Sequence, residues 1–469
     1  MGSIGPTPSR AEKIDFSHHI NTKSKARHSS PLKDIIKFMG VDGMISLAGG
    51  LPHPSLFPVQ QAKFDCLAPG APLPDYDNDT AGTSEDDNDN GNDILRLTLG
   101  RGSKNPGDLD LTQLLQYETV HSPPCPYEVL LHPGNTNAWA KIVGFLCEDN
   151  DYVLVEEYTY PSAQALWIPL GIRAVPVCAD QEGISADVLR GVLEGWDECA
   201  RRSRRPRVLY LVSVGSNPTG ITISRERGRE YETTLYTPLT NRTNIVLVED
   251  DPYYFLQYPA YNHNHNHNHS PSPEQRTSTT LATPTTVSQF LKTLTPSFLS
   301  MDTQGRVIRL ESFSKTLFPG LRLGYFIANP QFTERLLRAT EVETQDPAGL
   351  SQAFVLGLLN KWGVNGYLVW LQRLQGENRR RRDWLVRAFY ECFTVLPAGE
   401  SPVPKAEGLV ACLRDCTGDL KPVFSLIDPT AGMFIWAKFY FSHVPRFQQL
   451  QAQGDSSFND PEQTFATEL

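Results

Sequence analysis

The segment Val307-Ile308-Arg309-Leu310-Glu311-Ser312-Phe313-Ser314-Lys315 joins an apolar run of strand length to a lysine with serines beside it. A lysine amine that is partly desolvated at a strand end can have a lowered pKa and can attack an aldehyde to form a Schiff base. The serine hydroxyls can donate to a phosphate, and Arg322, seven residues beyond the lysine, can clamp that phosphate in a bidentate way. Alone, S-x-S-K is weak evidence, because most lysines are simply solvated.

Apolar runs of strand length recur along the chain. Besides 307–310 they cover 128–132, 152–156, 208–214, 244–249 and 321–328. Most are continuously apolar, which is typical of strands buried on both faces. Helix-like segments lie between them, for example 137–148 and 185–202. This alternation predicts an α/β fold around a mainly parallel sheet, in which ligands bind at the carboxyl ends of the strands.

An acidic motif, Glu249-Asp250-Asp251-Pro252-Tyr253-Tyr254, ends one of these runs. A buried carboxylate needs a positive partner, and a protonated pyridine nitrogen is one. An acidic turn that caps the next helix explains the motif equally well.

Two turns follow other strands. Gly134-Asn135-Thr136 enters a helix whose free N–H groups can bind an anion, although Asn135 or Thr136 can also be a plain N-cap. Asn217-Pro218-Thr219-Gly220 can be a simple turn, or it can hold the asparagine amide where it donates to a ligand oxygen.

In this order the motifs resemble fold-type I, class I/II aminotransferases that use pyridoxal 5′-phosphate (PLP), closest to the fungal aromatic amino acid and 2-aminoadipate group. Two further segments match that group, 45–58 with Ala48-Gly49-Gly50-Leu51-Pro52 and 155–161 with Tyr158-Thr159-Tyr160-Pro161. The resemblance covers roughly residues 30–440 and is highly specific as a combination.

The resemblance implies a large domain with a mixed, mainly parallel sheet flanked by helices, and a smaller α+β domain that is C-terminally truncated. The expected organisation is a flexible segment 1–30, an entrance segment 31–70, an acidic disordered loop 71–93, a large PLP-binding domain 94–360 with a low-complexity insertion 261–286, and a partial small domain 361–469. Segment 71–93 holds eight acids and no Lys or Arg, so it accounts for most of the net charge of −10. The alternating histidines that begin at His263 favour a disordered surface loop over a weak metal site.

The resemblance also implies a role for each matching residue. Lys315 is expected to carry the cofactor as a Schiff base and to move the α-proton, and Asp250 to pair with the pyridine nitrogen. Tyr253 and Asn217 would bind the phenolic oxygen, Tyr160 would stack on the ring, and Gly50 would line the substrate pocket. The expected phosphate ligands are Asn135, Thr136, Ser312, Ser314 and Arg322, with Tyr117 reaching across a homodimer.

The chain departs from the family pattern at two places. The helix that should follow Tyr117 is missing, and the C-terminal arginine that binds the substrate carboxylate has no counterpart before Leu469. Amino-acid binding is therefore expected to weaken unless another group substitutes. An impaired protein or an incomplete sequence would explain the same departures.

The expected function is amino transfer between an aromatic, 2-aminoadipate-like or lysine-like amino acid and a 2-oxo acid, with a role in secondary metabolism as an option. The alternatives are another PLP reaction on the same fold, such as C–S lyase or decarboxylase chemistry, and an inactive PLP-fold protein. Clustered basic residues of a nucleic-acid surface are missing, and no apolar run reaches the about 18 residues of a membrane helix. The basic runs 201–207 and 379–382 are expected to lie on solvated faces. The eight cysteines are expected to be mostly buried free thiols of a cytoplasmic protein.

Overall fold

The structure, a computed structural model, describes residues 15–26, 61–70, 92–98, 121, 123–236, 245–263 and 287–453. Gly50 and Tyr117 lie outside these residues, as do 71–91 of the acidic segment and 264–286 of the insertion. Asn92 and Asp93, which the sequence placed in the acidic loop, begin strand β2 (Asn92–Thr98). None of the described helices is long and apolar enough to cross a membrane.

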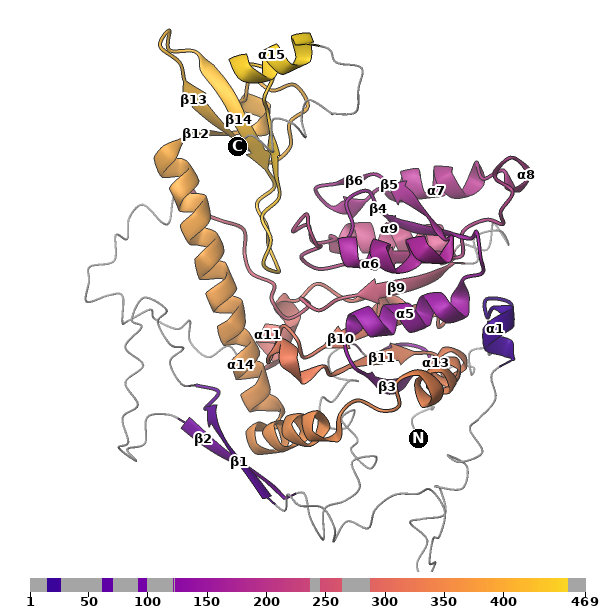
Figure 1. The fold of residues 1–469 in the computed structure, drawn as a ribbon. Coiled ribbons are helices and arrows are strands. Elements are labelled where there is room, and N and C mark those ends of the chain that lie inside the picture. The colour runs from indigo at the N-terminus through magenta and orange to yellow at the C-terminus, as the bar shows by residue number, and fades with distance from the viewer. Residues whose placement is uncertain are drawn as a thin grey trace, which may run out of the picture.

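Within the described residues, a seven-stranded sheet forms the large domain, in the order β3-β11-β10-β9-β8-β4-β5 (Figure 1). Its strands are β3 (Glu128–His132), β4 (Tyr152–Glu156), β5 (Arg173–Val177), β8 (Val208–Leu211), β9 (Val246–Asp250), β10 (Val307–Ser312) and β11 (Gly324–Ala328). The pairs from β10 to β5 are parallel, and β11 is antiparallel to both β10 and β3. The predicted α/β fold with a mainly parallel sheet is thus confirmed.

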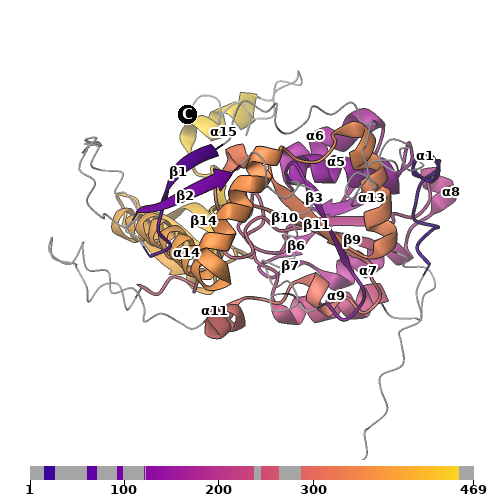
Figure 2. The ribbon, with the colours of Figure 1, turned by 90° about the horizontal axis from the view of Figure 1, so that it is seen from below.

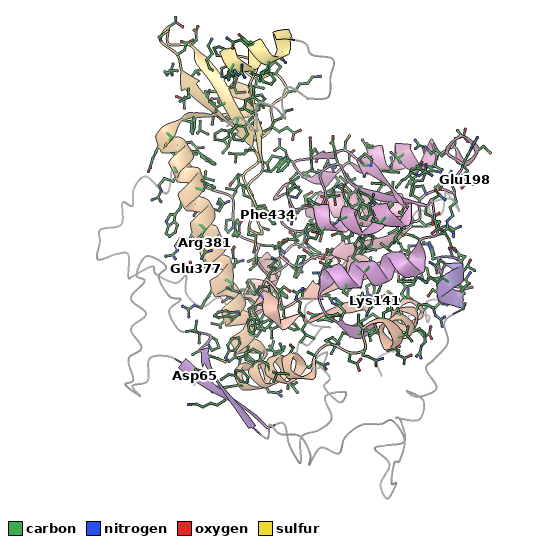
Figure 3. All side chains as sticks on the ribbon, viewed as in Figure 1. Asp65, Lys141, Glu198, Glu377, Arg381 and Phe434 are labelled. Atoms are coloured by element: carbon green, nitrogen blue, oxygen red, sulfur yellow. The ribbon has the colours of Figure 1, made fainter. Side chains whose placement is uncertain are left out.

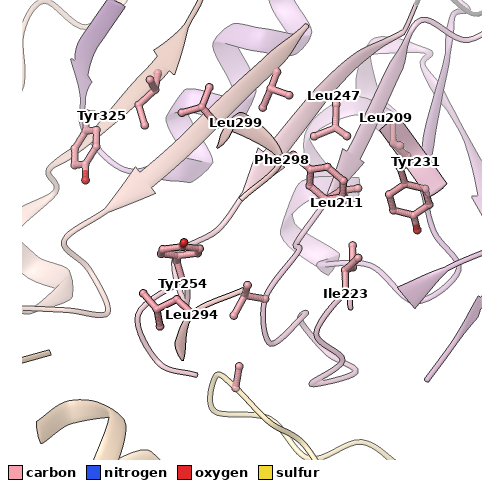
Figure 4. Close-up of a cluster of buried hydrophobic side chains, with 14 of the residues drawn as sticks. Leu209, Leu211, Ile223, Tyr231, Leu247, Tyr254, Leu294, Phe298, Leu299 and Tyr325 are labelled. Atoms are coloured by element: carbon pink, nitrogen blue, oxygen red, sulfur yellow. The ribbon is translucent and has the colours of Figure 1, made fainter. Parts of the chain in front are cut away.

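Helices cover both faces of this sheet (Figures 1 and 2). One face packs against α5 (Asn135–Leu146), α6 (Pro161–Trp167) and α13 (Pro330–Glu343). The other packs against α7 (Ala186–Glu194), α9 (Arg225–Tyr236), α11 (Val287–Thr293), α12 (Phe298–Met301) and part of α14 (Gly349–Cys392). Figure 4 shows the second core, where Leu209, Leu211 and Leu247 of the strands meet Tyr231 and Phe298 of the helices. Because successive strand residues point to opposite faces, strands such as β8, β9 and β10 contribute to both cores.

Continuous apolar runs correctly predicted strands buried on both faces, since every residue of β8, β9, β10 and β11 is buried. Predicted elements differ from the structure in their bounds, and the strand expected over 208–214 ends at Leu211. The helix expected over 185–202 is interrupted, because α7 ends at Gly195 and Asp197 caps a new helix, α8 (Glu198–Arg201). The strand expected over 321–328 begins at Gly324, because Pro319–Leu321 form a 3-10 turn, η6, and Arg322 has φ 47°.

Helix α14 leads into the small domain and changes direction at Gly363, where φ is 65°. Beyond it lie β12 (Thr394–Pro397), the 3-10 turn η7 (Ala398–Glu400), β13 (Leu409–Arg414), β14 (Leu420–Leu426), β15 (Ala437–Phe439) and α15 (Pro445–Gln453). Strands β12 to β15 form an antiparallel sheet in chain order. Gly363 lies next to the boundary expected at 361, and the division into domains stays a prediction.

Short elements surround the two sheets. They are α1 (Thr22–Lys25), the antiparallel pair β1 (Gln61–Leu67) with β2, the 3-10 turn η4 (Ile168–Leu170), and the pair β6 (Ala179–Asp180) with β7 (Gly183–Ile184). Phe64 of β1 packs edge-on against Phe354 of α14, with ring centroids 5.3 Å apart. The β1–β2 pair therefore rests on α14 through aromatic contact.

Two surface expectations were wrong. Only Cys147 and Cys412 are buried, while Cys178, Cys199, Cys392 and Cys416 are exposed. In the second basic run, Arg382 is buried rather than solvated, because its guanidinium donates to Asp428 Oδ1 at 2.9 Å and to the Pro429 carbonyl at 2.5 Å.

Candidate active site

The residues with expected chemical roles gather at one edge of the large sheet. They follow the carboxyl ends of parallel strands: Asn135 after β3, Tyr160 after β4, Asn217 after β8, Asp250 at the end of β9, and Lys315 after β10. Strand β3 runs parallel to β10, because both pair antiparallel with β11. Ligands of parallel sheets bind at this edge.

Asp250 lies at the centre of this edge, and hydrogen bonds reach both of its carboxylate oxygens. Asn135 Nδ2 donates to Oδ1 at 2.6 Å, and the Tyr210 hydroxyl donates to Oδ2 at 2.7 Å. Burial raises the pKa of Asp250, and the two donors oppose that shift because they stabilise the ionised form. A carboxylate held in this way can pair with a protonated ring nitrogen.

Small hydroxyls and an arginine meet beside the start of α5. Ser312 Oγ donates to Ser314 Oγ at 2.9 Å, and Arg322 Nη2 donates to the same Ser314 oxygen at 2.6 Å. Gly134 lies directly against this arginine, since a Cβ at position 134 would lie 2.9 Å from Arg322 Nη1. The glycine also has φ 109°, which a larger residue adopts only under strain. The structure thus brings an arginine and two hydroxyls together beside Gly134, a set of donors that could bind an anion.

A phenol and an amide meet on the β9 side of the site. Burial raises the pKa of Tyr253 well above its usual value, and the neighbouring Asn217 amide opposes this shift. Tyr253 therefore keeps its proton at neutral pH and can donate it to an oxygen of a ligand. Tyr160, the residue before α6, is half-buried.

Lys315 lies in the turn after β10, and its side chain is exposed. The next residue anchors the turn to α14. Tyr367 donates its hydroxyl proton to Thr316 Oγ1 at 3.1 Å, and Trp370 Nε1 donates to the Thr316 carbonyl at 2.7 Å. The lysine amine is thus accessible while its backbone is fixed.

The structure modifies two of the expected phosphate contacts. The Asn135 amide nitrogen is turned to Asp250, so its side chain is directed to the ring-nitrogen position rather than to the anion site. Thr136 is exposed in the first turn of α5. The phosphate roles of Asn135, through its backbone, and of Thr136 stay predictions, as do those of Tyr117 and Gly50.

Several residues that support the site were missed from the sequence. Tyr210 belongs to a fully buried apolar strand, and its phenol was the one signal that could have indicated a polar role. Glu156, at the end of β4, accepts from Ser216 Oγ at 2.8 Å and so holds the segment that leads to Asn217. Burial raises the pKa of Glu156 to about 7.

The described residues fit PLP. The anion site suits its phosphate, and Asp250 has a side-chain environment suited to a pyridinium. The buried Asn135 Oδ1 has no hydrogen-bond partner within the described part of the chain, which leaves an acceptor beside Asp250. An accessible lysine amine completes the set that a Schiff base requires.

Several known proteins are similar to this chain in sequence. The chain is 36% identical over 439 residues to an aromatic amino acid aminotransferase of Schizosaccharomyces pombe, covering 91% of this chain and 82% of the relative. The chain belongs to the PLP-dependent aminotransferases of fold type I. An L-tyrosine:2-oxoglutarate aminotransferase of Tapinella panuoides is 33% identical over 465 residues, covering 94% of this chain and 77% of the relative.

Solved structures agree with this membership of the aminotransferases. The crystal structure of aminotransferase Aro8 from Candida albicans superposes with a TM-score of 0.73 at 30% identity, covering 94% of this chain and 84% of that one. No family model matches the chain. The protein is a PLP-dependent enzyme, and the comparisons do not favour the lyase, decarboxylase or inactive alternatives.

Proposed function

We propose that this aminotransferase transfers the amino group of an aromatic amino acid to a 2-oxo acid. The observation that carries the substrate class is an aromatic pair beside the site. Trp436 of the small domain packs on Tyr158, two residues before Tyr160, with ring centroids 5.3 Å apart. The two side chains are 41% and 51% exposed, so each keeps a face open to a ligand.

A second aromatic contact lies deeper on the same segment. Phe434, two residues before Trp436, packs edge-on against Tyr253 with ring centroids 5.7 Å apart. Figure 3 shows Phe434 between the small domain and the large sheet. An aromatic substrate side chain would gain contact area and favourable ring geometry along such a wall. The names of the Schizosaccharomyces pombe and Tapinella panuoides relatives support the same class.

Each residue of the site has a proposed part in the reaction. PLP, when bound, supplies an electron sink for the negative charge that develops at the α-carbon. Lys315 would hold the cofactor through its amine and move the α-proton of the substrate, and Asp250 would pair with the ring nitrogen. Tyr253 and Asn217 donate to the phenolic oxygen, and Tyr160 covers one face of the ring.

The phosphate has its own proposed ligands. Arg322, Ser312 and Ser314 bind it together with the backbone at the start of α5, which fixes the position of the reacting atoms.

The test is a coupled assay of the PLP-loaded protein with 2-oxoglutarate and one amino acid at a time. Tyrosine, phenylalanine and tryptophan are expected to give glutamate together with the matching oxo acid. 2-Aminoadipate, lysine and alanine are expected to give at least tenfold lower kcat/KM. Trp436→Ala should lower kcat/KM for tryptophan more than for alanine, and an equal loss for both would contradict the role of the aromatic wall.

We further propose that the enzyme is a cytoplasmic homodimer whose phosphate site includes Tyr117 of the partner subunit. Sedimentation velocity gives the oligomeric state, and Tyr117→Phe should weaken PLP binding in a dimer without dissociating it. A monomer with full PLP affinity would contradict the shared site. Imaging of the tagged chain in its own cells tests the location.

A further inference from the structure

The loop 427–436 connects β14 to β15 and carries both small-domain residues of the aromatic wall, Phe434 and Trp436. We call it the wall loop. In Figure 1 it extends, in yellow, from the small sheet to the large domain. Phe434 and Trp436 contact Tyr253 and Tyr158 of the large domain, so the place of the two rings depends on how the wall loop is held there.

Backbone hydrogen bonds join the wall loop to the chain that follows β9. The Tyr258 N–H donates to the Thr430 carbonyl at 2.7 Å, and the Gly432 N–H donates to the Leu256 carbonyl at 3.0 Å. The residues between these donors and acceptors form an antiparallel bridge. The Tyr258 hydroxyl adds a side-chain contact, since it donates to the Ala431 and Gly432 carbonyls, each 3.1 Å away. The wall loop is thus bonded to the segment that bears Tyr253.

A second part of the large domain, the turn that bears Asn217, lies directly against the wall loop. A Cβ at Gly220 would lie 2.6 Å from the Phe434 carbonyl oxygen, and one at Gly215 would lie 2.8 Å from Gly432 Cα. Both glycines have positive φ, 70° and 57°. The two backbones therefore meet without a side chain between them, which only glycine allows at this distance.

The side chain that fastens the start of the wall loop is Arg382 of α14, which is buried. Its Nη1 donates to Asp428 Oδ1 at 2.9 Å and also to the Pro429 carbonyl. Its Nη2 donates to the Pro259 carbonyl at 2.6 Å, in the segment after β9. Its Nε donates to Asp383 Oδ1 at 2.7 Å, on the same helix. Arg382 therefore bonds to α14, to the large domain and to the wall loop at once.

This joint depends on the shape of the arginine head group as well as on its charge. A guanidinium holds several acceptors at fixed angles in one plane, whereas a lysine ammonium is a single charged point on a flexible chain. The Arg382 guanidinium also lies over the Tyr258 ring, with its carbon 5.0 Å from the ring centroid. Asp428 in turn accepts from the Tyr261 N–H, which adds a second bond between the wall loop and the same segment.

We propose that Arg382 is a positioning residue for the aromatic wall: it holds the wall loop on the large domain and thereby sets the preference for aromatic substrates. With the loop held, Phe434 stays on Tyr253 and Trp436 stays on Tyr158. Arg382 acts through the loop and has no part in the proton transfers. The inference rests on the aromatic preference proposed above.

The first test is the ratio of kcat/KM for tryptophan to kcat/KM for alanine, measured with the PLP-loaded enzyme below the unfolding temperature of each variant. Arg382→Met should lower this ratio about threefold to tenfold, which corresponds to the loss of one aromatic contact. Arg382→Lys should recover part of the loss, because it keeps a cation beside Asp428. A residue that only stabilises the fold would lower both values of kcat/KM equally and leave their ratio unchanged.

The matched control is Arg227→Met. Arg227 of α9 also joins a carboxylate and a carbonyl, since Nη2 donates to Asp180 Oδ2 at 2.7 Å and Nη1 donates to the Ile184 carbonyl at 2.8 Å. This variant should lower stability without changing the substrate ratio. Tyr258→Phe is the milder change at the wall loop, because it keeps the ring and removes only the hydroxyl. It should lower the ratio in the same direction as Arg382→Met, and it serves as the test if Arg382→Met does not fold.

Hydrogen exchange tests the positioning without any amino transfer. The amides of Tyr258 and Gly432 should exchange faster in Arg382→Met and in Tyr258→Phe than in wild type, and this increase should exceed that in the β13–β14 ladder. A wild-type substrate ratio in both variants, or wild-type exchange at these two amides, would overturn the proposal. If the wild type itself shows no aromatic preference, the proposed function fails, and hydrogen exchange then decides alone whether Arg382 anchors the wall loop.

Discussion

Replacing Tyr210 with phenylalanine removes a single hydroxyl from the Asp250 site. The ring keeps its contact with Trp139, whose centroid lies 4.6 Å away, so packing is preserved. What is lost is a donor at 2.7 Å from Asp250 Oδ2, in a place where both groups are buried. A hydrogen bond to a charged group contributes roughly 1.5–3 kcal/mol, and each 1.4 kcal/mol is about a factor of ten.

The loss should therefore weaken the pairing of Asp250 with the PLP ring nitrogen by about 10-fold to 100-fold, because the pKa of Asp250 rises further when its donor is removed. PLP affinity, measured by absorbance titration, is expected to fall by a factor within this range. The rate of conversion of bound PLP to its amine form by tyrosine should fall with it. The two readouts separate binding from chemistry.

Tyr231→Phe is the matched control. Tyr231 is also fully buried, and its hydroxyl donates to the Ile184 carbonyl on the other face of the sheet. This variant should lower stability without changing PLP affinity. If Tyr210→Phe binds PLP as tightly as wild type, or if Tyr231→Phe is equally impaired, the hydroxyl of Tyr210 does not support Asp250.

Three further predictions concern other contacts. Arg322→Gln should weaken the binding of PLP at least tenfold but leave the affinity for pyridoxal, which lacks the phosphate, unchanged. An equal loss of affinity for both compounds in titrations would contradict an anion site shared with Ser314. In the wild type, the buried Glu156 carboxyl holds its proton until the pH reaches about 7, so the free energy of unfolding should fall by at most about 3 kcal/mol between about pH 4.5 and 7. Glu156→Gln should remove this fall. If urea unfolding shows the same pH dependence for both proteins, this prediction is refuted. Arg382→Met removes the guanidinium that pairs with Asp428 and should lower the free energy of unfolding by about 3–5 kcal/mol. Calorimetry should then show the small domain unfolding at a lower temperature. An unchanged thermogram would show that the ion pair does not stabilise the fold.

Sequence alone was sufficient for the α/β fold and for the places of the main residues. Continuous apolar runs identified the buried strands, and Asp250 and Lys315 each stood at the end of one. These are local signals, because strand length and turn residues are written within a few positions of each other. The parallel arrangement then required that the strand ends meet at one edge.

Partners of those residues needed the tertiary structure. Asn135 and Asp250 are 115 positions apart, and Tyr210 and Asp250 are 40 apart, so no local pattern links them. The strand order β8-β9-β10 places Tyr210 beside Asp250 on one face and Arg309 beside Asp251 on the other. Apolar periodicity tells which residues are buried but not which buried polar groups face each other. That pairing follows from strand order and register, which are set by long-range packing.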